Sequence, residues 1–151
     1  MLNLIIPPPI QMAIFGVAMW LIDKYLPRFN FAFSQSSSIS LFLVAAGCIV
    51  AILGIVEFIK AQTTINPHNP ENTSQLVKSG IYQFTRNPMY VGLFLVLAAW
   101  GFYLANFLAF ICLPLFSTYI TQFQILPEEK VLQEKFKEEF REYANDVRRW
   151  I

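Results

Sequence analysis

The sequence predicts an all-α integral membrane protein with about four transmembrane helices and a C-terminal amphipathic helix. Hydrophobic residues make up 56% of the chain and charged residues only 14%. A soluble chain of 151 residues has too little interior to bury that much apolar surface. The apolar residues also form long runs, with the charges collected between and after them. We therefore treat residues 1–151 as one membrane domain.

The first two apolar runs are each expected to form one span. Residues 10–26 follow three prolines, which can delay the start of the first span, and residues 39–59 have the length of a single spanning helix. Small residues recur at helical spacing in the second run: Gly47, Ala51 and Gly54. Because small residues let helix backbones approach closely in lipid, this face is expected to pack against a neighbouring helix.

The third apolar run is too long for one span. Residues 89–126 comprise 38 residues, whereas one span needs about 20. Asn106 is the one strongly polar side chain near the middle, which places a break there. The run is therefore expected to form a helical hairpin with spans at residues 89–105 and 107–126.

The positive charges predict the topology. Of the 11 Lys and Arg residues, Lys24 lies near the end of the first span and Arg28 follows it. The remainder fall in the loop of residues 60–88 and in the tail: Lys60, Lys78, Arg86, Lys130, Lys135, Lys137, Arg141, Arg148 and Arg149. Positive charge collects on the cytoplasmic side of membrane proteins. The multi-pass chain is thus expected to place the loop and both termini in the cytoplasm.

The tail, residues 127–149, is expected to form an amphipathic helix. Its apolar residues recur at steps of three and four: Leu132, Phe136, Phe140, Tyr143, Val147 and Trp150. Pro127 suits a first helical turn, and acidic residues suit the positive end of a helix dipole. Such a helix lies on the membrane surface or packs over the loop.

Two classes of partner are not expected. The net charge is +1 and no basic stripe with interleaved aromatic residues occurs, which argues against nucleic acid. The single histidine, His68, has no second ligand near it in the sequence, and Cys48 and Cys112 lie within apolar runs. No metal site is expected.

Polar residues on the cytoplasmic side form two clusters, residues 76–92 and residues 127–136. A hairpin brings its own ends together, so the clusters should be neighbours in space. The facing side chains are Arg86, Asn87 and Tyr90 from the first cluster and Glu128 and Glu129 from the second. A cavity between them can hold a polar cofactor beside an apolar substrate.

The ordered motifs resemble a known family. "LVKSGIYQFTRNPMYVG", followed after the hairpin by "EEKVLQEKFKEEFREYANDVRRWI", is similar to the isoprenylcysteine carboxyl methyltransferase family, in particular to its short bacterial members. The resemblance covers about residues 58–151. It implies a membrane methyltransferase of the bacterial inner membrane that uses S-adenosyl-L-methionine and acts on a lipophilic or lipidated substrate. The expected reaction resembles the O-methylation of an isoprenylcysteine carboxylate.

The resemblance also implies roles for individual residues. The cofactor-binding positions are Ser74, Gln75, Leu76, Val77, Tyr82, Asn87, Pro88, Met89, Tyr90, Glu128 and Glu129. The positions expected to serve catalysis are Arg86, Asn87 and Glu128, and the position expected to face the substrate is Gln124.

Three positions depart from the family pattern. Asn87 stands where the family usually has histidine, and because an amide does not titrate, a histidine base is excluded there. Gln124 replaces an arginine that contacts the substrate carboxylate in eukaryotic members, which leaves the acceptor open. Lys137 replaces a glycine.

Other functions are compatible with the same sequence. One is a phospholipid N-methyltransferase, whose family shares the paired glutamates. A second is a membrane lipid reductase that uses NADPH, and a third is a small structural membrane protein.

Overall fold

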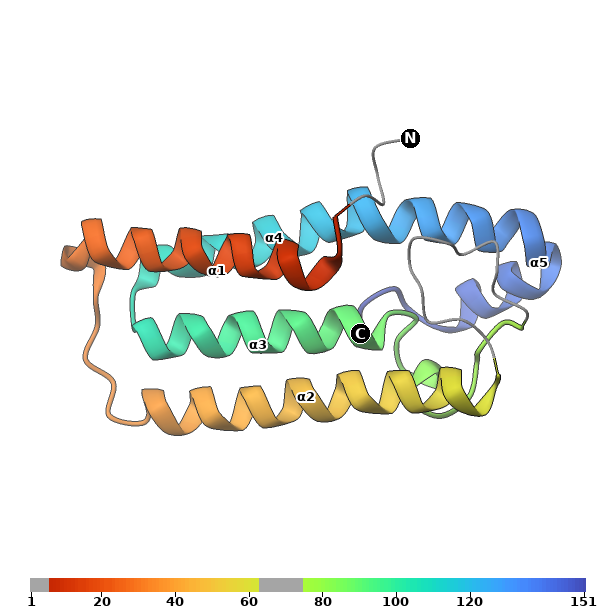
Figure 1. Ribbon diagram of the computed structural model, residues 1–151, viewed down its shortest axis with the longest axis horizontal. Helices are drawn as coiled ribbons and strands as arrows, with labels where there is room; N and C mark the ends of the chain where they lie inside the picture. The colour runs from red at the N-terminus through yellow and green to blue at the C-terminus, as the bar shows by residue number, and fades with distance from the viewer. Residues whose placement is uncertain (1–5, 63–74) are drawn as a thin grey trace.

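The computed structural model describes residues 6–62 and 75–151, and these residues are mostly helical (Figure 1). The α-helices are α1 (Pro8–Tyr25), α2 (Ser36–Lys60), α3 (Pro88–Leu104), α4 (Cys112–Ile120) and α5 (Leu126–Asp146). Short 3-10 helices are η1 (Pro27–Phe29), η3 (Gly80–Gln83) and η4 (Phe107–Ile111), and a π-helix, η5 (Thr121–Ile125), joins α4 to α5. Within these ranges there is no β-strand, which confirms the predicted all-α class. His68 and the predicted cofactor contact Ser74 lie outside the described residues.

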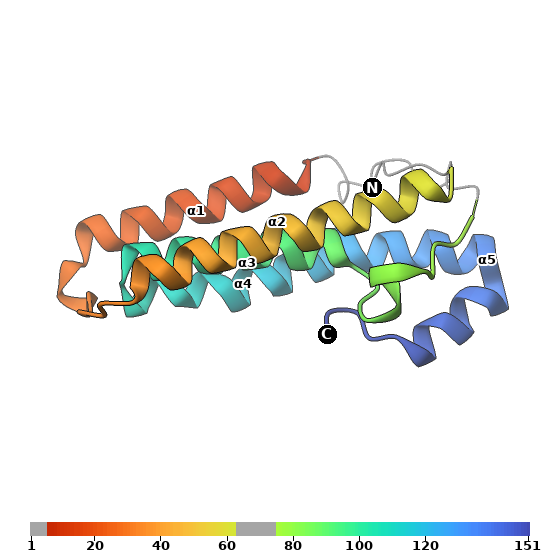
Figure 2. The same cartoon turned by 90° about the horizontal axis from the view of Figure 1, so that it is seen from below.

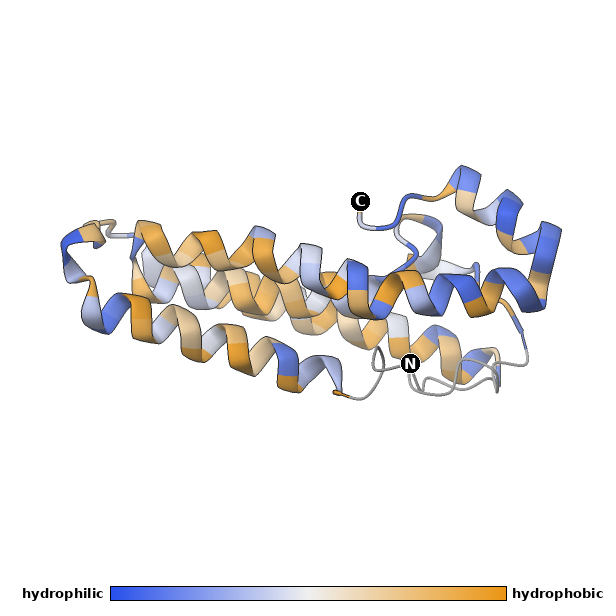
Figure 3. Cartoon of the chain, turned by 90° about the horizontal axis from the view of Figure 1, so that it is seen from above, coloured by the Kyte–Doolittle hydropathy of each residue, from blue (hydrophilic) through white to orange (hydrophobic). Residues whose placement is uncertain are grey.

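Helix α3 lies at the centre of the bundle. It packs against α1, α2 and α4, and all four helices run along the long axis of the molecule (Figure 1). Apolar residues dominate these helices, whereas polar residues concentrate on α5 (Figure 3). The fold therefore consists of an apolar helix bundle with a more polar end, where the loop before α3 and the whole of α5 lie.

The contact between α2 and α3 depends on small residues. A Cβ atom built on Gly47 would lie 2.7 Å from the carbonyl oxygen of Gly92, and one built on Gly92 would lie 2.7 Å from the carbonyl oxygen of Gly47. Gly54 packs against the ring of Pro88, with a built Cβ only 3.1 Å from Cγ of the proline. The close packing predicted for this face of α2 is confirmed.

The turn between α3 and η4 is fixed by Asn106, at the predicted break in the third apolar run. Its buried side-chain oxygen accepts hydrogen bonds from the backbone nitrogens of Leu108 at 3.0 Å and Ala109 at 3.4 Å. Its Nδ2 donates to Oδ1 of Asn30 at 2.6 Å and to the carbonyl oxygen of Leu26 at 3.1 Å. Asn106 therefore both caps the returning helix and ties the hairpin turn to the loop that follows α1.

Two helices in the described ranges are long and apolar enough to cross a membrane. One is α2, and the other is the helical stretch of Phe107–Asp146, whose apolar part precedes Pro127. Helix α3 is apolar but has 17 residues, and α1 is not among the candidates because Gln11, Asp23 and Lys24 reduce its hydropathy. These helices agree with a membrane protein.

The tail is not the single straight helix predicted for residues 127–149. Helix α5 bends sharply at Lys137, whose φ of 46° and ψ of −114° are not helical, and it ends at Asp146. The second half turns back so that the C-terminus lies beside the start of α3 (Figure 2). Lysine is a good helix former, which is why the periodicity of the sequence did not reveal this bend.

Replacing Lys137 by glycine is expected to stabilise the protein. A positive φ strains any residue that has a Cβ, and relief of about 1–3 kcal/mol outweighs the extra chain entropy of glycine, about 0.5–1 kcal/mol. We expect Lys137→Gly to raise the melting temperature in detergent by a few degrees. Lys130→Gly, at an exposed helical position of the same α5, should lower it. A drop with Lys137→Gly comparable to the drop with Lys130→Gly would show that the bend is not strained.

Candidate functional site

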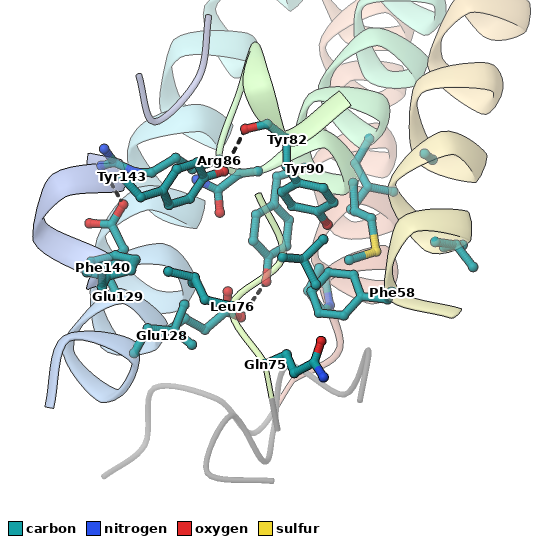
Figure 4. Close-up of a pocket in the computed structure, with 18 of the residues that line it drawn as sticks. Phe58, Gln75, Leu76, Tyr82, Arg86, Tyr90, Glu128, Glu129, Phe140 and Tyr143 are labelled. Carbon is teal, nitrogen blue, oxygen red and sulfur yellow. Dashed lines mark hydrogen bonds and ion pairs between the residues drawn. The ribbon is translucent and has the colours of Figure 1, made fainter. Parts of the chain in front are cut away.

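A cavity of about 350 Å³ lies at the polar end of the bundle, between the start of α3 and α5 (Figure 4). The loop before α3 contributes Gln75, Leu76, Val77 and Tyr82, and the start of α3 contributes Arg86, Asn87, Met89, Tyr90 and Leu93. Helix α5 contributes Glu128, Glu129, Leu132, Phe140 and Tyr143. The remaining wall is apolar and is made by Pro8, Pro9, Ala51, Ile55 and Phe58 of α1 and α2.

The two ends of the hairpin meet directly in this cavity. The hydroxyl of Tyr90 donates a hydrogen bond of 2.5 Å to Oε1 of Glu128 (Figure 4). Burial raises the pKa of the Glu128 carboxyl from 4.5 to about 8, even though the hydrogen bond from Tyr90 opposes the shift. Among the described residues, Tyr90 is the hydrogen-bond donor to Glu128. A buried carboxyl group with further accepting capacity therefore faces the cavity.

Glu129, next in the chain, is instead held by two arginines. Its Oε1 accepts from a terminal nitrogen of Arg86 at 2.8 Å, and its Oε2 accepts from Arg149 at 2.7 Å. Burial acts to raise the pKa of Glu129, but the hydrogen bonds from Arg149 and Arg86 outweigh it and lower the pKa. Glu129 is thus an ionised, paired carboxylate, and Glu128 is the more weakly paired one.

Arg86 holds the returning half of α5 in place. Its other terminal nitrogen donates to the carbonyl oxygens of Ala144 and Val147, both at 2.7 Å, and its backbone nitrogen donates to the carbonyl oxygen of Arg148 at 3.0 Å. The side chain is only 11% exposed, so it does not extend to lipid headgroups. Arg86 therefore links the start of α3, Glu129 and the C-terminal tail.

Asn87 and Thr85 hold the same tail. Nδ2 of Asn87 donates to the carbonyl oxygen of Arg149 at 2.9 Å, and the hydroxyl of Thr85 donates to that oxygen at 3.3 Å. The indole nitrogen of Trp150 donates to the hydroxyl of Thr121 in η5 at 3.0 Å. The last residues of the chain thus pack between the start of α3 and the π-helix and close one side of the site.

The loop before α3 is fixed to the end of α2 through Glu57. This carboxylate accepts hydrogen bonds from Lys60 at 2.7 Å and from the hydroxyl of Ser79 at 2.5 Å. The next residue, Gly80, has a φ of 58°, and a Cβ built on it would lie 2.6 Å from Cδ of Glu57. Glycine is therefore needed here both for its backbone conformation and for space.

Replacing Gly80 by alanine is expected to disturb the loop and, through Tyr82, the cavity. The clash with Glu57 and the positive φ together should cost about 1–3 kcal/mol. We expect a lower melting temperature and faster proteolysis near residue 80. The control is Gly16→Ala in α1, where a built Cβ lies no closer than 4.0 Å to a neighbour. Equal stability of the two variants would contradict this role for Gly80.

Of the predicted site residues that the structure describes, all line this one cavity except two. Pro88 is buried at the first turn of α3, beneath Gly54. Gln124 is 1% exposed in the π-helix, where its Nε2 donates to the carbonyl oxygen of Ile6 at 3.0 Å. The cavity does not include Gln124, although it was predicted to face the substrate.

Several cavity residues were not predicted. Phe140 and Tyr143 appeared in the sequence only as members of an apolar stripe, yet the bend at Lys137 carries both to the cavity. The hydroxyl of Tyr143 donates to the carbonyl oxygen of Tyr82 at 2.7 Å, which joins α5 to the loop (Figure 4). Phe58 packs edge-to-face on Tyr82, with ring centroids 5.5 Å apart. In the sequence, Phe58 follows the one acidic residue of its apolar run and begins the segment that resembles the family. Neither feature identified it as a cavity residue.

The part of the chain that the structure describes contains no group of three or more His, Cys, Asp or Glu residues that could hold a metal ion.

The family model described as "Phospholipid methyltransferase" matches residues 36–139, which extend from the start of α2 to the second half of α5. The chain belongs to the phospholipid methyltransferase family. This family contains the integral membrane methyltransferases that resemble isoprenylcysteine carboxyl methyltransferase, so the family relationship predicted from the motifs is confirmed.

One similar protein comes from Haemophilus influenzae (strain ATCC 51907 / DSM 11121 / KW20 / Rd) and is described as an uncharacterized protein. It is 46% identical over 63 residues, which are 42% of this chain and 100% of that protein. No solved structure matches the chain significantly. The family points to a membrane methyltransferase, and its members generally use S-adenosyl-L-methionine.

Proposed function

We propose that this protein is an S-adenosyl-L-methionine-dependent methyltransferase that acts on a lipophilic acceptor held in the membrane. The observation that carries the proposal is the cavity in which Glu128 and Tyr90, from the two ends of the hairpin, meet at 2.5 Å. One wall is polar, and the opposite wall, made by residues such as Ile55 and Pro9, is apolar. A polar cofactor and an apolar acceptor can therefore be held side by side.

The residues present suit this cofactor. A cavity of about 350 Å³ falls within the range of small-molecule sites. Glu128 can accept hydrogen bonds from an ammonium or from ribose hydroxyls. Tyr82, Tyr90 and Phe140 supply aromatic surfaces that favour an adenine or a sulfonium. We propose Gln75, Leu76, Val77 and Met89 as further contacts, and Ser74 stays a predicted one.

When bound, S-adenosyl-L-methionine supplies an electrophilic methyl group on a positively charged sulfur. Transfer is a direct displacement, so the protein must align the acceptor and exclude water. Glu128 and Tyr90 would orient the cofactor, and Phe58, Leu93 and Leu132 would exclude water. Arg86, Asn87 and Glu129 are engaged with protein partners. We therefore assign them the positioning of the site walls, which refines the catalytic role predicted for Arg86 and Asn87.

An amine headgroup fits the cavity better as the acceptor than a carboxylate does. Arg86 is the one cation among the described residues that line the cavity, and both of its terminal nitrogens are bound to Glu129 or to backbone carbonyls. Because the charge of Arg86 is paired with Glu129, a carboxylate acceptor would find only its Nε donor, which is buried and has no hydrogen-bond partner among the described residues. An amine, in contrast, can approach Glu128, which no arginine of the described residues pairs with. Phospholipid N-methylation is therefore favoured, with isoprenylcysteine carboxylate methylation as the second candidate.

We further propose that four helices span the bacterial inner membrane. Helices α1 and α3 would complete the bundle with the two apolar candidates, α2 and the helical stretch that begins at Phe107. The distribution of Lys and Arg then places the cavity and both termini on the cytoplasmic side.

The proposal is tested by methyl transfer from labelled S-adenosyl-L-methionine in detergent. Extracted bacterial lipids, defined amine phospholipids and prenylcysteine analogues are offered separately. We expect label in the amine phospholipids; label only in prenylcysteine would select the second candidate. Competition between S-adenosylhomocysteine and NADPH excludes a reductase, because only the former should bind. A protein that binds neither and transfers no methyl group would be structural.

A further inference from the structure

A second cavity, of about 440 Å³, lies in the seam between α1 and α2. Both helices pack against α3 but make little contact with each other, so α3 forms the floor of the seam (Figures 1 and 2). The lining residues that matter here are Gly16 and Trp20 of α1, Ser40 and Val44 of α2, and Val96 and Trp100 of α3.

This seam leads into the candidate site. On α3 the site cavity ends at Leu93, and the seam cavity begins one turn later at Val96. On α1, Pro9 lines the site and Met12 lines the seam. On α1 and α3 the two cavities therefore occupy successive turns. On α2, Val44 of the seam and Ala51 of the site are two turns apart, with Gly47 packed against Gly92 between them. The path is the line from one cavity to the other along α1 and α3.

The length of the path matches one leaflet of a membrane. Met89 and Trp100 lie 11 residues apart on α3, which corresponds to about 16 Å of helix rise. The hydrocarbon core of a bilayer is about 30 Å thick, so one leaflet is about 15 Å deep. A chain that starts at the cofactor cavity and ends at Trp100 is thus as long as the leaflet is deep.

The lining suits a hydrocarbon chain and little else. Apart from the hydroxyl of Ser40, the side chains that line the seam are apolar or are indole rings. The indole nitrogen of Trp100 donates to the carbonyl oxygen of Gly16 at 3.0 Å, so the polar edge of the ring is satisfied. Trp100 also stacks on Tyr103, with ring centroids 5.4 Å apart, which fixes the far end of the path.

We propose that the seam holds one acyl chain of the acceptor lipid, so that the chain sets the position of the headgroup at Glu128. This inference rests on the proposed function, and it names the acceptor as a lipid of one leaflet with a chain of matching length. Helix α1, which forms one wall, lies outside the segment that matches the family, residues 36–139.

Gly16 offers a way to shorten the path. A Cβ built there lies 4.0 Å from the nearest side-chain atoms, those of Leu97 and Trp100, so alanine fits and a large side chain would fill the seam. The test variant is Gly16→Phe, and Val44→Phe blocks the seam from the opposite wall. The controls are Gly16→Ala and Ile14→Phe; Ile14 lies on α1, is 57% exposed and does not line the seam.

The experiment measures methyl transfer to amine phospholipids with hexanoyl, decanoyl and palmitoyl chains. The wild-type protein should prefer palmitoyl chains. Either blocked variant should lose activity on palmitoyl lipids by at least about tenfold and keep its activity on hexanoyl lipids, because each methylene excluded from an apolar site costs binding free energy. An unchanged chain-length profile in both blocked variants would overturn the inference.

A second readout separates this inference from the proposed function. A palmitoyl phospholipid with an amine headgroup and a photoreactive group at the chain end should label residues near Trp100 in the wild type but not in the blocked variants. Labelling there without any methyl transfer would refute the function and leave the seam as an acyl-chain site. If the lipid instead labels outward-facing residues such as Leu41 and Ile52 as strongly as residues near Trp100, the inference is overturned. A cross-link between two copies of the chain through the seam would overturn it as well, because a second copy would then occupy the seam.

Discussion

Replacing Glu128 by alanine is expected to lower the affinity for S-adenosylhomocysteine by about ten- to a hundredfold, because a hydrogen bond to a charged group is worth about 1.5–3 kcal/mol. The effect should be large since Glu128 is the one cavity carboxylate that no arginine of the described residues pairs with. Calorimetric titration of the detergent-purified variant measures it. The matched control is Glu134→Ala, an exposed residue farther along α5. Unchanged affinity in Glu128→Ala would remove this residue from the site.

The pH dependence of binding checks the same assignment. Burial raises the pKa of Glu128 to about 8, so the carboxyl group is mostly protonated at pH 7 in the ligand-free protein. The ammonium group of S-adenosylhomocysteine favours the ionised form of Glu128, so binding should release a proton. The affinity should rise with pH up to about 8 and level off above it, and Glu128→Gln should abolish this dependence. The folding stability of the ligand-free protein depends on pH in the opposite direction. Between pH 4.5 and about 8 the folded state keeps a proton on Glu128 that the unfolded state has lost, so the free energy of unfolding decreases as the pH rises.

Replacing Arg86 by alanine is expected to destabilise the protein by about 3–5 kcal/mol, because the substitution removes one partner of a buried ion pair. The backbone carbonyls of Ala144 and Val147 lose their donor at the same time. The melting temperature in detergent should fall by roughly 10 °C, and the C-terminal tail should become sensitive to carboxypeptidase.

The control for this prediction is Arg141→Ala. Arg141 lies on the returning half of α5, the half that Arg86 contacts, but its side chain is 68% exposed. Its guanidinium lies 3.7 Å from the carboxylate of Glu138, compared with 2.8 Å between Arg86 and Glu129. Such surface pairs contribute little to stability. If Arg86→Ala melts at the same temperature as Arg141→Ala, then Arg86 does not hold the tail.

The sequence alone was sufficient to predict that the two polar clusters, residues 76–92 and residues 127–136, lie next to each other. Chain connectivity and one polar residue, Asn106, required the long apolar run to fold back, and a hairpin has to bring Tyr90 near Glu128. The small-residue pattern likewise predicted that this face of α2 packs against a neighbouring helix, and that helix is α3. These features follow from side-chain types at fixed spacing, which a sequence displays directly.

The remainder of the site depends on contacts that leave no pattern in the sequence. The partners of Arg86 in the tail are backbone carbonyls, and every residue has one. The bend in α5 occurs at a lysine, although a positive φ is normally the place of glycine. Gln124 was expected at the substrate, but the π-helix directs it to the carbonyl oxygen of Ile6.

The central claim is that the two ends of the hairpin build one cofactor site. Titration of S-adenosylhomocysteine into the detergent-purified protein, its Tyr90→Ala variant and its Glu128→Ala variant tests this claim most directly. We expect saturable one-to-one binding to the wild type, and strongly weakened binding to both variants while each remains folded. The absence of binding to the wild type, or equal affinity in all three proteins, would contradict the claim.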